Sequence, residues 1–309
     1  MIITVTPNTG IDYTYQVSDF QLNKTIRAAN SAWGMGGKAT DVSWILGKLG
    51  IPTRALGFAA GLNGKRMEGM LRERGVETDF VQVEGETRLN TLVVVPGRGQ
   101  STITSSSLRV SPDHISEFTA RYQRALEVAS CVVMGGSLPN GVPMEFYERA
   151  ITMAHEHQVP VIFDSSGPSL AAGLMGRPDL IKPNQAELGD LLGHFPSTRD
   201  EVRQAAVTLH QNFGAGVIAT LGEEGAIAVF EKSSYFIHPP VVPIVSSAGA
   251  GDGVLAGMAI AYLRREPLEQ GLRYGFALAG AILGTLATAD FQVDEYQRLL
   301  SQIRITPIG

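Results

Sequence analysis

The stretch "SSAGAGDGVLAGM" at 246–258 decides how the rest of the sequence is interpreted. It follows a β-like stretch at 241–245 and runs into an apolar segment. Gly249, Ala250 and Gly251 carry almost no side-chain bulk, so their amide N–H groups can approach a ligand directly. The helix that we expect to follow adds the positive end of its dipole. The segment therefore predicts an anion-binding site.

Asp252 follows these three residues directly. A carboxylate beside an anion site would repel the ligand if its task were binding, but it suits a base that takes a proton from a hydroxyl attacking the bound anion. Phosphoryl transfer needs this pairing of fixed donors and a base. The alternative is that Asp252 is only a favourable charge in a first helical turn. That alternative does not explain three successive small residues, so we predict a catalytic base.

Composition narrows the class of protein. The chain has 309 residues, 44% hydrophobic and 18% charged, which fits one large α/β domain or two unequal ones. A net charge of −5 argues against a nucleic-acid partner. The longest apolar stretches fall below the roughly 20 residues of a membrane helix, and the N-terminus does not resemble a signal peptide. With Cys131 as the single cysteine, we expect a cytoplasmic protein that binds no membrane.

The second half of the chain repeats one pattern. Short apolar runs end in small or polar residues, and they lie at 131–137, 159–167, 179–184 and 216–225. Helical patterns such as those at 111–129 and 199–213 separate them. This alternation predicts a parallel sheet covered on both faces. Because ligands bind outside the carboxyl ends of such strands, we expect the site along that edge.

The first third of the chain differs, with polar alternation in strand-like segments at 11–17, 91–97 and 101–106. They suit a small, half-exposed sheet that forms a lid beside the main one. We assign residues 11–31 and 87–106 to this lid. The main domain then takes 1–10, 32–86 and 107–309. A second subunit could cover the lid's sheet edges, so we expect a homodimer.

Two further segments of the chain are rich in glycine, and neither forms a familiar nucleotide-binding motif. "WGMGGKATD" at 33–41 lacks the third glycine of a dinucleotide fingerprint, and Ala39 replaces the Ser or Thr that closes a P-loop. What remains is a turn feeding a helix at 40–49, which suits an anionic or polyhydroxyl ligand unless the turn only starts the helix. "TLGEEGA" at 220–226 predicts a hairpin on the ligand edge.

Several motifs, taken in order, resemble the ribokinase-like, PfkB-type carbohydrate kinases over nearly the whole chain. The similarity is greatest to the branch that includes 1-phosphofructokinase and tagatose-6-phosphate kinase. The motifs are "TPNTGID" at 6–12, "LNKTIRA" at 22–28, "ETRLNT" at 86–91, "GSLPNG" at 136–141, "DSSGPSL" at 164–170 and "KPNQAEL" at 182–188. The resemblance implies a three-layer α/β sandwich with a mainly parallel central sheet, a small β lid and ATP-dependent phosphotransfer to an alcohol.

The resemblance also implies a role for individual residues. It makes Asp252 the base and 249–251 the anion hole. The residues it places near the sugar substrate are Asp12, Gly36, Gly37, Lys38, Asp41, Arg88, Asn90 and Ser137, with Lys24 and Arg27 as helpers. Those it places near ATP are Asn184, Thr220, Gly222 and Gly225, with Asn184 and Glu187 holding Mg²⁺ through water.

Some of these residues also have plainer explanations. Asn184 and Glu187 are spaced like a helix cap and its partner. Arg88 could be an ordinary lid cation, and Asp12 could form a turn. "HEH" at 155–157 tempts a metal interpretation, but its histidines would point apart on a helix, so we expect them on the surface.

The sequence departs from the family at Asp41, where an Asn is expected. Asn donates and accepts hydrogen bonds, whereas ionised Asp only accepts them. Either the substrate presents a different hydroxyl pattern, or Asp41 pairs with a cation such as Lys38. Ser246 and Gly253 also replace the family's usual Asp or Asn and Ser or Thr.

The function expected from these residues is an ATP-dependent kinase of a phosphorylated ketohexose. Fructose 1-phosphate ranks first as substrate, followed by tagatose 6-phosphate and fructose 6-phosphate. Two alternatives stay open: a kinase of an unphosphorylated sugar or nucleoside, and a catalytically silent nucleotide- or sugar-binding regulator. The broken fingerprint argues against a dehydrogenase.

Overall fold

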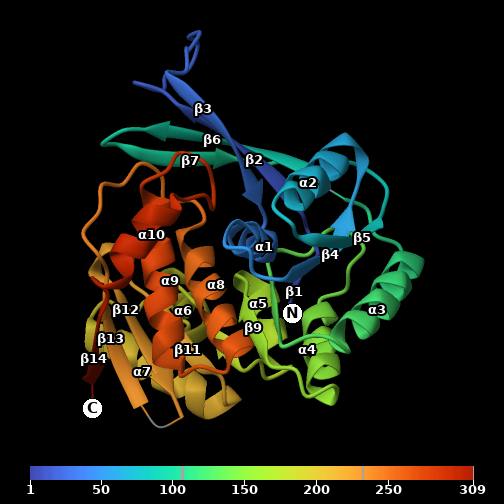
Figure 1. Cartoon of the computed structure of the whole chain (residues 1–309), viewed down its shortest axis with the longest axis vertical. Helices are drawn as coiled ribbons and strands as arrows, with labels where there is room; N and C mark the ends of the chain where they lie inside the picture. Colours follow the sequence, from blue (N-terminus) through green and yellow to red (C-terminus); the bar gives the residue numbers. More distant parts are fainter. Residues whose placement is uncertain (106–107, 232, 309) are drawn as a thin grey trace.

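The fold is built around a large central sheet (Figure 1). The computed structural model describes residues 1–105, 108–231 and 233–308. The sheet's ten strands in these ranges are, in order, β14 (Arg304–Ile308), β13 (Ser233–His238), β12 (Ala226–Phe230), β11 (Gly216–Thr220), β10 (Leu180–Ile181), β9 (Val161–Asp164), β8 (Cys131–Gly135), β1 (Ile2–Thr6), β4 (Thr53–Ala59) and β5 (Glu77–Gln82). Neighbouring strands from β5 to β11 are parallel, and β12, β13 and β14 are added antiparallel. The predicted, mainly parallel sheet is confirmed.

Helices cover both faces of this sheet. Alternating side chains of each strand point to opposite faces, so Ile2 joins one hydrophobic core and Ile3 the other. The first core is covered by α1 (Lys38–Lys48), α2 (Gly61–Glu73), α8 (Ala250–Arg264), α9 (Leu268–Leu283) and α10 (Val293–Leu300). The second is covered by α3 (Pro112–Leu126), α4 (Phe146–Glu156), α5 (Gly167–Leu174), α6 (Gln185–Leu192) and α7 (Arg199–Phe213). This is the predicted three-layer sandwich.

Local sequence signals set the helix ends. The Ser111 side chain caps α3 by accepting a hydrogen bond from the His114 amide, and Thr198 caps α7 in the same way through Glu201. Residues 252–261 of α8 are all buried, and the apolar side chains at 254–256 and 258–260 belong to the first core, as expected for a helix that is apolar on nearly every face. In the described ranges, no helix has both the length and the hydropathy to span a bilayer.

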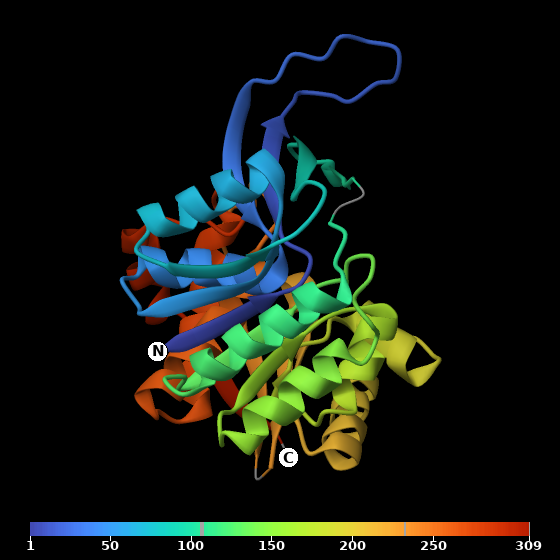
Figure 2. The ribbon, with the colours of Figure 1, turned by 90° about the vertical axis from the view of Figure 1, so that its right-hand side faces the viewer.

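The small sheet, here called the lid, has the strand order β3 (Asn30–Gly36), β2 (Gly10–Gln16), β6 (Arg88–Val95) and β7 (Gly99–Ile103). β3 pairs with β2 without interruption up to Gly10 opposite Gly36, so the lid's sheet continues past residue 31, where the sequence assignment ends it. Ser106, which ends the predicted strand 101–106 and the predicted lid, lies outside the described residues. Figure 2 shows the loop at 17–29, between β2 and β3, projecting away from the rest of the molecule.

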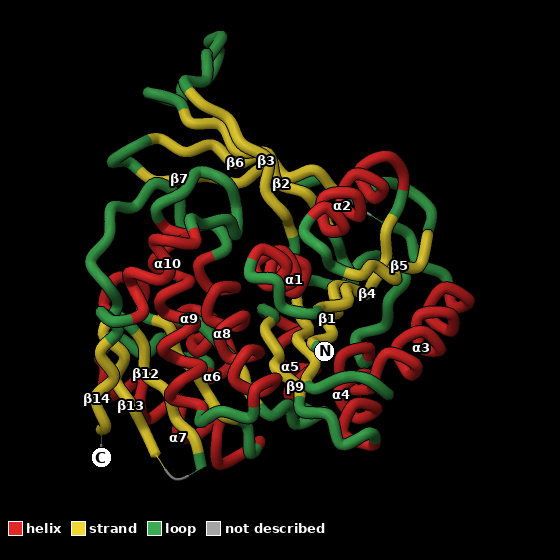
Figure 3. Tube along the Cα trace, viewed as in Figure 1, coloured by secondary structure: helices red, strands yellow, loops and turns green. Residues whose placement is uncertain are grey.

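The β-like stretch expected at 241–245 was wrong, because the structure has a loop there (Figure 3). Prolines at 239, 240 and 243 remove backbone donors that a strand would need. Both edges of β13 are also occupied, by β12 and β14. The loop reaches the lid, where Gln100 Oε1 accepts hydrogen bonds from Ser246 Oγ at 3.0 Å and from the Ser247 amide at 3.1 Å.

Candidate active site

The N-terminus of α8 provides backbone donors. Gly249, which precedes the helix, has φ 85°, and a Cβ there would collide with Ala289, so the position requires glycine. The Ala250 amide donates a long hydrogen bond to the Ser247 carbonyl at 3.4 Å. Within the described chain, the Gly249 and Gly251 amides have no backbone acceptor. A helix N-terminus with such amides can bind an anion.

Asp252 lies in the first turn of α8 and is only 9% exposed. Burial and, to a smaller extent, the nearby Asp164 carboxylate raise the pKa of its carboxyl group to about 7, although Lys38 and Lys182 oppose the rise. A carboxyl group with a pKa near neutrality can accept a proton and release it again, which a general base requires.

Two lysines meet at the buried carboxylate of Asp164. Lys38 Nζ lies 3.0 Å and Lys182 Nζ 3.4 Å from Asp164 Oδ2, and Lys38 also lies 3.7 Å from Glu187 Oε1. Burial alone would lower the pKa of Lys38, but Asp164, Glu187 and Asp252 raise it above its usual value. A Cβ built on Gly251 would lie 3.2 Å from Lys182 Nζ, so this ammonium group borders the α8 N-terminus. The anion site therefore has positive charge as well as amide donors.

Asp12 and Asn90 stand side by side on β2 and β6. Asp12 Oδ1 accepts a hydrogen bond from Asn90 Nδ2 at 2.8 Å, and its Oδ2 accepts one from Thr288 Oγ1 at 2.8 Å. Burial nevertheless raises the pKa of Asp12 above its usual value. Gly36 passes so close that a Cβ would collide with Asp12 Oδ1. The predicted sugar-side carboxylate and the glycine turn therefore lie together. Asp12 lies within β2 and is bonded to Asn90 and Thr288, so it is not a simple turn-forming residue.

Arg88, at the start of β6, lies against the first loop of the chain. Its Nη2 donates to the Asn8 carbonyl at 3.3 Å, and Asn8 Nδ2 donates to Ser137 Oγ at 3.0 Å. Among the residues that the structure describes, none is a hydrogen-bond partner of the buried Arg88 Nε. Burial lowers the pKa of the guanidinium group, while Asp12 and Asp41 act in the opposite direction. A buried N–H of a cation without a partner is a costly arrangement that an anionic ligand would relieve.

Asp41 does not pair with Lys38, which was one of the two explanations considered for it. Lys38 is instead held by Asp164 and Glu187. Asp41 is 4% exposed and lies near the Asp252 carboxyl group. Its buried Oδ1 has no hydrogen-bond partner among the described residues. Burial and the charges of Asp252 and Asp12 raise its pKa well above the usual value.

The four residues predicted near ATP lie at the carboxyl ends of β10 and β11. Asn184 and Glu187 form a reciprocal capping box on α6, with both hydrogen bonds at 2.9 Å. The Thr220 amide donates to the Pro183 carbonyl at 3.0 Å, which joins this cap to the next turn. Gly222 begins the short 3₁₀ helix η1 (Gly222–Glu224) and Gly225 follows it directly. The antiparallel pairing of β11 with β12 confirms the predicted hairpin.

Asn184 and Glu187 therefore do serve as a helix cap, and the donor chemistry decides whether they also fit magnesium. The oxygens of both side chains already accept backbone hydrogen bonds. Mg²⁺ prefers oxygen donors and keeps several waters. Glu187 Oε1, which faces Lys38, thus fits a metal held through its waters, and the capping bonds argue against direct coordination.

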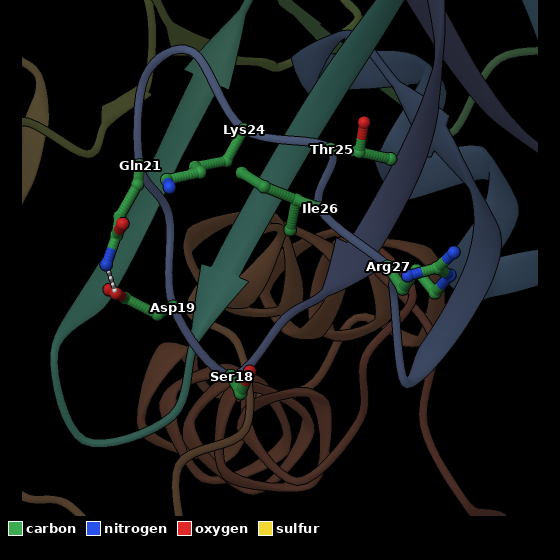
Figure 4. Close-up of a pocket in the computed structure, with 7 residues that line it drawn as sticks. All are labelled: Ser18, Asp19, Gln21, Lys24, Thr25, Ile26 and Arg27. Atoms are coloured by element: carbon green, nitrogen blue, oxygen red, sulfur yellow. Dashed lines mark hydrogen bonds between the residues drawn. The ribbon is translucent and has the colours of Figure 1, made fainter.

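Lys24 and Arg27 are not brought to the other predicted residues. Both are exposed in the projecting loop at 17–29, where they line a separate pocket of about 270 Å³ (Figure 4). Figure 4 shows Lys24 extending across this loop, with Asp19 and Gln21 hydrogen-bonded to each other at its edge. His157 is exposed, and His155 pairs with Asp179 at 3.0 Å. Within the described residues, no group of three or more acidic, His or Cys side chains could hold a metal.

Sequence reasoning missed Asp164, Lys182, Thr288 and Asn8. Asp164 ends β9 and Lys182 follows β10, in the strand-end segments that predicted the ligand edge, so their positions carried a signal. Thr288 reaches Asp12 from far along the chain. No motif in the sequence around Thr288 predicts its hydrogen bond to Asp12.

The mainly parallel α/β sandwich, with lysines and buried carboxyl groups along the carboxyl edge of its sheet, fits the ribokinase-like class of phosphotransferases. The model for "pfkB family carbohydrate kinase" matches residues 6–294, and this chain belongs to that family. It is an ATP-dependent carbohydrate kinase, so the predicted enzyme class is confirmed.

Named relatives cover the chain from end to end. It is 30% identical over 307 residues to 1-phosphofructokinase of Bacillus subtilis, covering 99% of both chains. It is 27% identical to tagatose-6-phosphate kinase of Staphylococcus epidermidis, covering 100% of both. A crystal structure of a possible 1-phosphofructokinase from Thermotoga maritima superposes with a TM-score of 0.88 at 26% identity, covering 100% of this chain and 99% of that one.

Replacing Lys182 with Met should weaken catalysis, because it removes one of the two ammonium groups beside the α8 amides. We expect kcat/KM for ATP to fall by about 100-fold, the scale for losing one preorganised charge donor. The matched control is Lys65→Met, which removes an exposed lysine from α2. Steady-state kinetics of both variants check the prediction, and equal values for the two would contradict it.

Proposed function

We propose that this kinase transfers the γ-phosphoryl group of Mg-ATP to a hydroxyl of a phosphorylated ketohexose. Fructose 1-phosphate is the first candidate, followed by tagatose 6-phosphate and fructose 6-phosphate. The observation that carries the proposal is the presence of two separate cationic places. One is formed by Lys38 and Lys182 beside α8. The other is Arg88 beside Asn8 and Ser137, which suits a phosphate already on the sugar.

The reaction follows from the position of Asp252. The amides of 249–251 and the two lysines hold the transferring phosphoryl group and stabilise the charge that spreads over its oxygens. The acceptor hydroxyl attacks phosphorus while the bond from phosphorus to the ADP oxygen breaks and ADP takes the electron pair. Asp252 accepts the hydroxyl proton. Asp12, fixed by Asn90 and Thr288, orients the other sugar hydroxyls.

The ATP side rests on α6 and the turn after β11. Asn184, Thr220, Gly222 and Gly225 would border the nucleotide, and Glu187 and Asn184 would hold Mg²⁺ through its waters. When bound, the metal neutralises charge on the ATP phosphates. Glu187 also faces Lys38, so the charge on this side is linked to the glycine turn on the sugar side.

A kinase of an unphosphorylated sugar is the second candidate, and one observation favours it. Asp12 and Asp41 are both buried on the sugar side, where they add negative potential that a sugar phosphate would meet. The pKa values of both carboxyl groups are raised, however, which reduces that negative charge. The phosphorylated substrate is therefore favoured.

Asp252→Asn should abolish most turnover while ATP binding survives, because the amide keeps the shape of the carboxyl group but cannot accept the proton. We expect kcat at saturating ATP and fructose 1-phosphate to fall about 10²- to 10⁴-fold, the range for general base catalysis. Turnover assays and calorimetric ATP titration measure the two effects.

The control for this variant is Asp113→Asn, which alters an exposed first-turn carboxylate of α3. It tests whether a charge at a helix N-terminus is all that Asp252 contributes. Unchanged turnover in Asp252→Asn would disprove the base.

Arg88→Gln should separate phosphorylated from unphosphorylated substrates. We expect KM for the preferred sugar phosphate to rise about 10- to 100-fold, as for the loss of a charged hydrogen-bonding group, with little change for the free sugar. The measurement compares fructose 1-phosphate, fructose 6-phosphate, tagatose 6-phosphate and the free sugars on the wild type and the variant. A free sugar turned over best by the wild type would favour the second candidate.

We also propose that two copies associate through the lid. Its strands and loop expose Tyr15, Phe20, Leu89 and Ile103 to solvent. A second copy would cover these side chains and the open edges of the small sheet. Sedimentation equilibrium should give a dimer, and Ile103→Asp should shift it to monomer; a wild-type monomer at micromolar concentration would refute the proposal.

A further inference from the structure

The loop at 285–290, between α9 and α10, contacts both the sugar side and the phosphoryl side of the site. Thr288 Oγ1 donates a hydrogen bond to Asp12 Oδ2 at 2.8 Å. One residue further along, the Ala289 amide donates to the Ala248 carbonyl at 3.3 Å, just before α8 begins. Both loop residues are buried. Two adjacent residues of one backbone therefore hold the sugar-side carboxylate and the start of the helix that provides the amide donors.

Two glycines let the loop pack closely against both sides. A Cβ on Gly34, which lies opposite Asp12 in the lid, would be 2.6 Å from the Thr288 amide nitrogen. A Cβ on Gly249 would be 2.4 Å from the Ala289 amide nitrogen. Ala289 itself has φ 54°, in the left-handed region that residues with a side chain rarely adopt. Such a conformation persists only where the surrounding structure fixes it, so the loop is held firmly between β3 and α8.

Asp290 anchors the loop from outside the site. Its Oδ1 accepts hydrogen bonds from Lys48 Nζ at 2.7 Å and from Arg74 Nη2 at 2.9 Å. Burial would raise the pKa of Asp290, but these two cations lower it below its usual value, so the anchor is ionised at neutral pH. All three side chains are partly buried, which reduces screening of the ion pairs by salt. Within the loop, Thr285 Oγ1 donates to the Asp290 carbonyl at 2.8 Å and closes the loop on itself.

We propose that Asp290 is a positioning residue, whose ion pairs act through the 285–290 loop to set Asp12 and the α8 amides at the right distance from each other. The inference rests on the proposed roles of Asp12 and of these amides. In-line transfer requires the attacking hydroxyl and the phosphorus atom to be held close and aligned, and small displacements are costly. A loop that contacts both sides meets this need, and its displacement disturbs both sides together.

Asp290→Asn keeps the size of the side chain but removes its charge, so it should loosen the loop. We expect kcat/KM for the sugar substrate to fall about 10- to 100-fold, the scale for a small misplacement of reacting groups, with changes in both kcat and the sugar KM. The matched control is Asp79→Asn, because Asp79 forms a similar ion pair with Arg121 at 2.7 Å on the edge strand β5. Steady-state kinetics use whichever sugar or sugar phosphate the wild type turns over fastest. Equal kinetics for the two variants would overturn the inference.

A double-mutant cycle separates positioning from a general loss of stability. Thr288→Val removes the bond to Asp12 and should raise the sugar KM about 10-fold, whereas Thr288→Ser keeps the hydroxyl and should restore the wild-type value. Combined with Asp290→Asn, Thr288→Val should cost less than the product of the two single losses, because both act through one loop. Combined with Asp79→Asn, its loss should simply multiply. Losses that also multiply with Asp290→Asn would contradict the proposal.

Hydrogen exchange of the full chain without substrates gives a readout that does not need turnover. Asp290→Asn should speed exchange several-fold at the backbone amides of 248–253 and of 10–14, because loosening the loop frees both sides. Asp79→Asn should leave these amides unchanged. Lys48→Gln removes one of the two partners of Asp290 and should give a smaller change of the same kind, which keeps the test available if Asp290→Asn does not fold. Unchanged exchange at 248–253 in Lys48→Gln and in any folded Asp290→Asn protein would refute the proposal.

The outcomes for the anchor and for the reaction can be told apart. If Asp252→Asn does not slow turnover, the proposed function fails. The exchange measurement still decides whether Asp290 holds the loop against the start of α8.

Discussion

The buried carboxylate of Asp164 holds the charged part of the site together. It ends β9 near the middle of the sheet and pairs with Lys38 from α1 and Lys182 from the loop after β10. Two ammonium groups this close would repel each other strongly without a shared counter-ion. Asp164 therefore allows both cations to stand beside the N-terminus of α8. The positive field for the phosphoryl group depends on a residue that need not touch the substrate.

The same balance explains the state of the other carboxyl groups. Lys38 and Lys182 are available to Asp252, which can ionise near neutral pH. In the described part of the chain, the cation near both Asp41 and Asp12 is Arg88, and burial raises the pKa of both carboxyl groups. A site with several acidic side chains can thus accept a polyanion, because its negative charge is either paired or neutralised by protons. The distribution of cations, rather than the number of carboxyl groups, determines how readily each carboxyl group ionises.

Sequence reasoning succeeded where a local pattern had a local cause. The helix that follows Gly249, the helical patterns of α3 and α7, and the main strands of the second half all depend on neighbours in the chain. It failed at 241–245, where apolar residues suggested a strand but prolines and the filled edges of β13 prevented one. It considered Lys38 as a partner for Asp41, but Lys38 pairs with Asp164, which lies more than a hundred residues away in the sequence. Contacts between distant segments, including Thr288 with Asp12, appear only once the sheet has assembled.

Gln100 links the two halves of the enzyme through a single side-chain oxygen. That oxygen receives hydrogen bonds from Ser246 and Ser247, a few residues before the α8 amides begin. If the lid swings outward, either these bonds break or the segment leading into the helix is pulled with it. The position of the lid and the conformation of the segment before α8 are thus coupled. A side chain of the lid is therefore tied directly to the segment from which α8 begins.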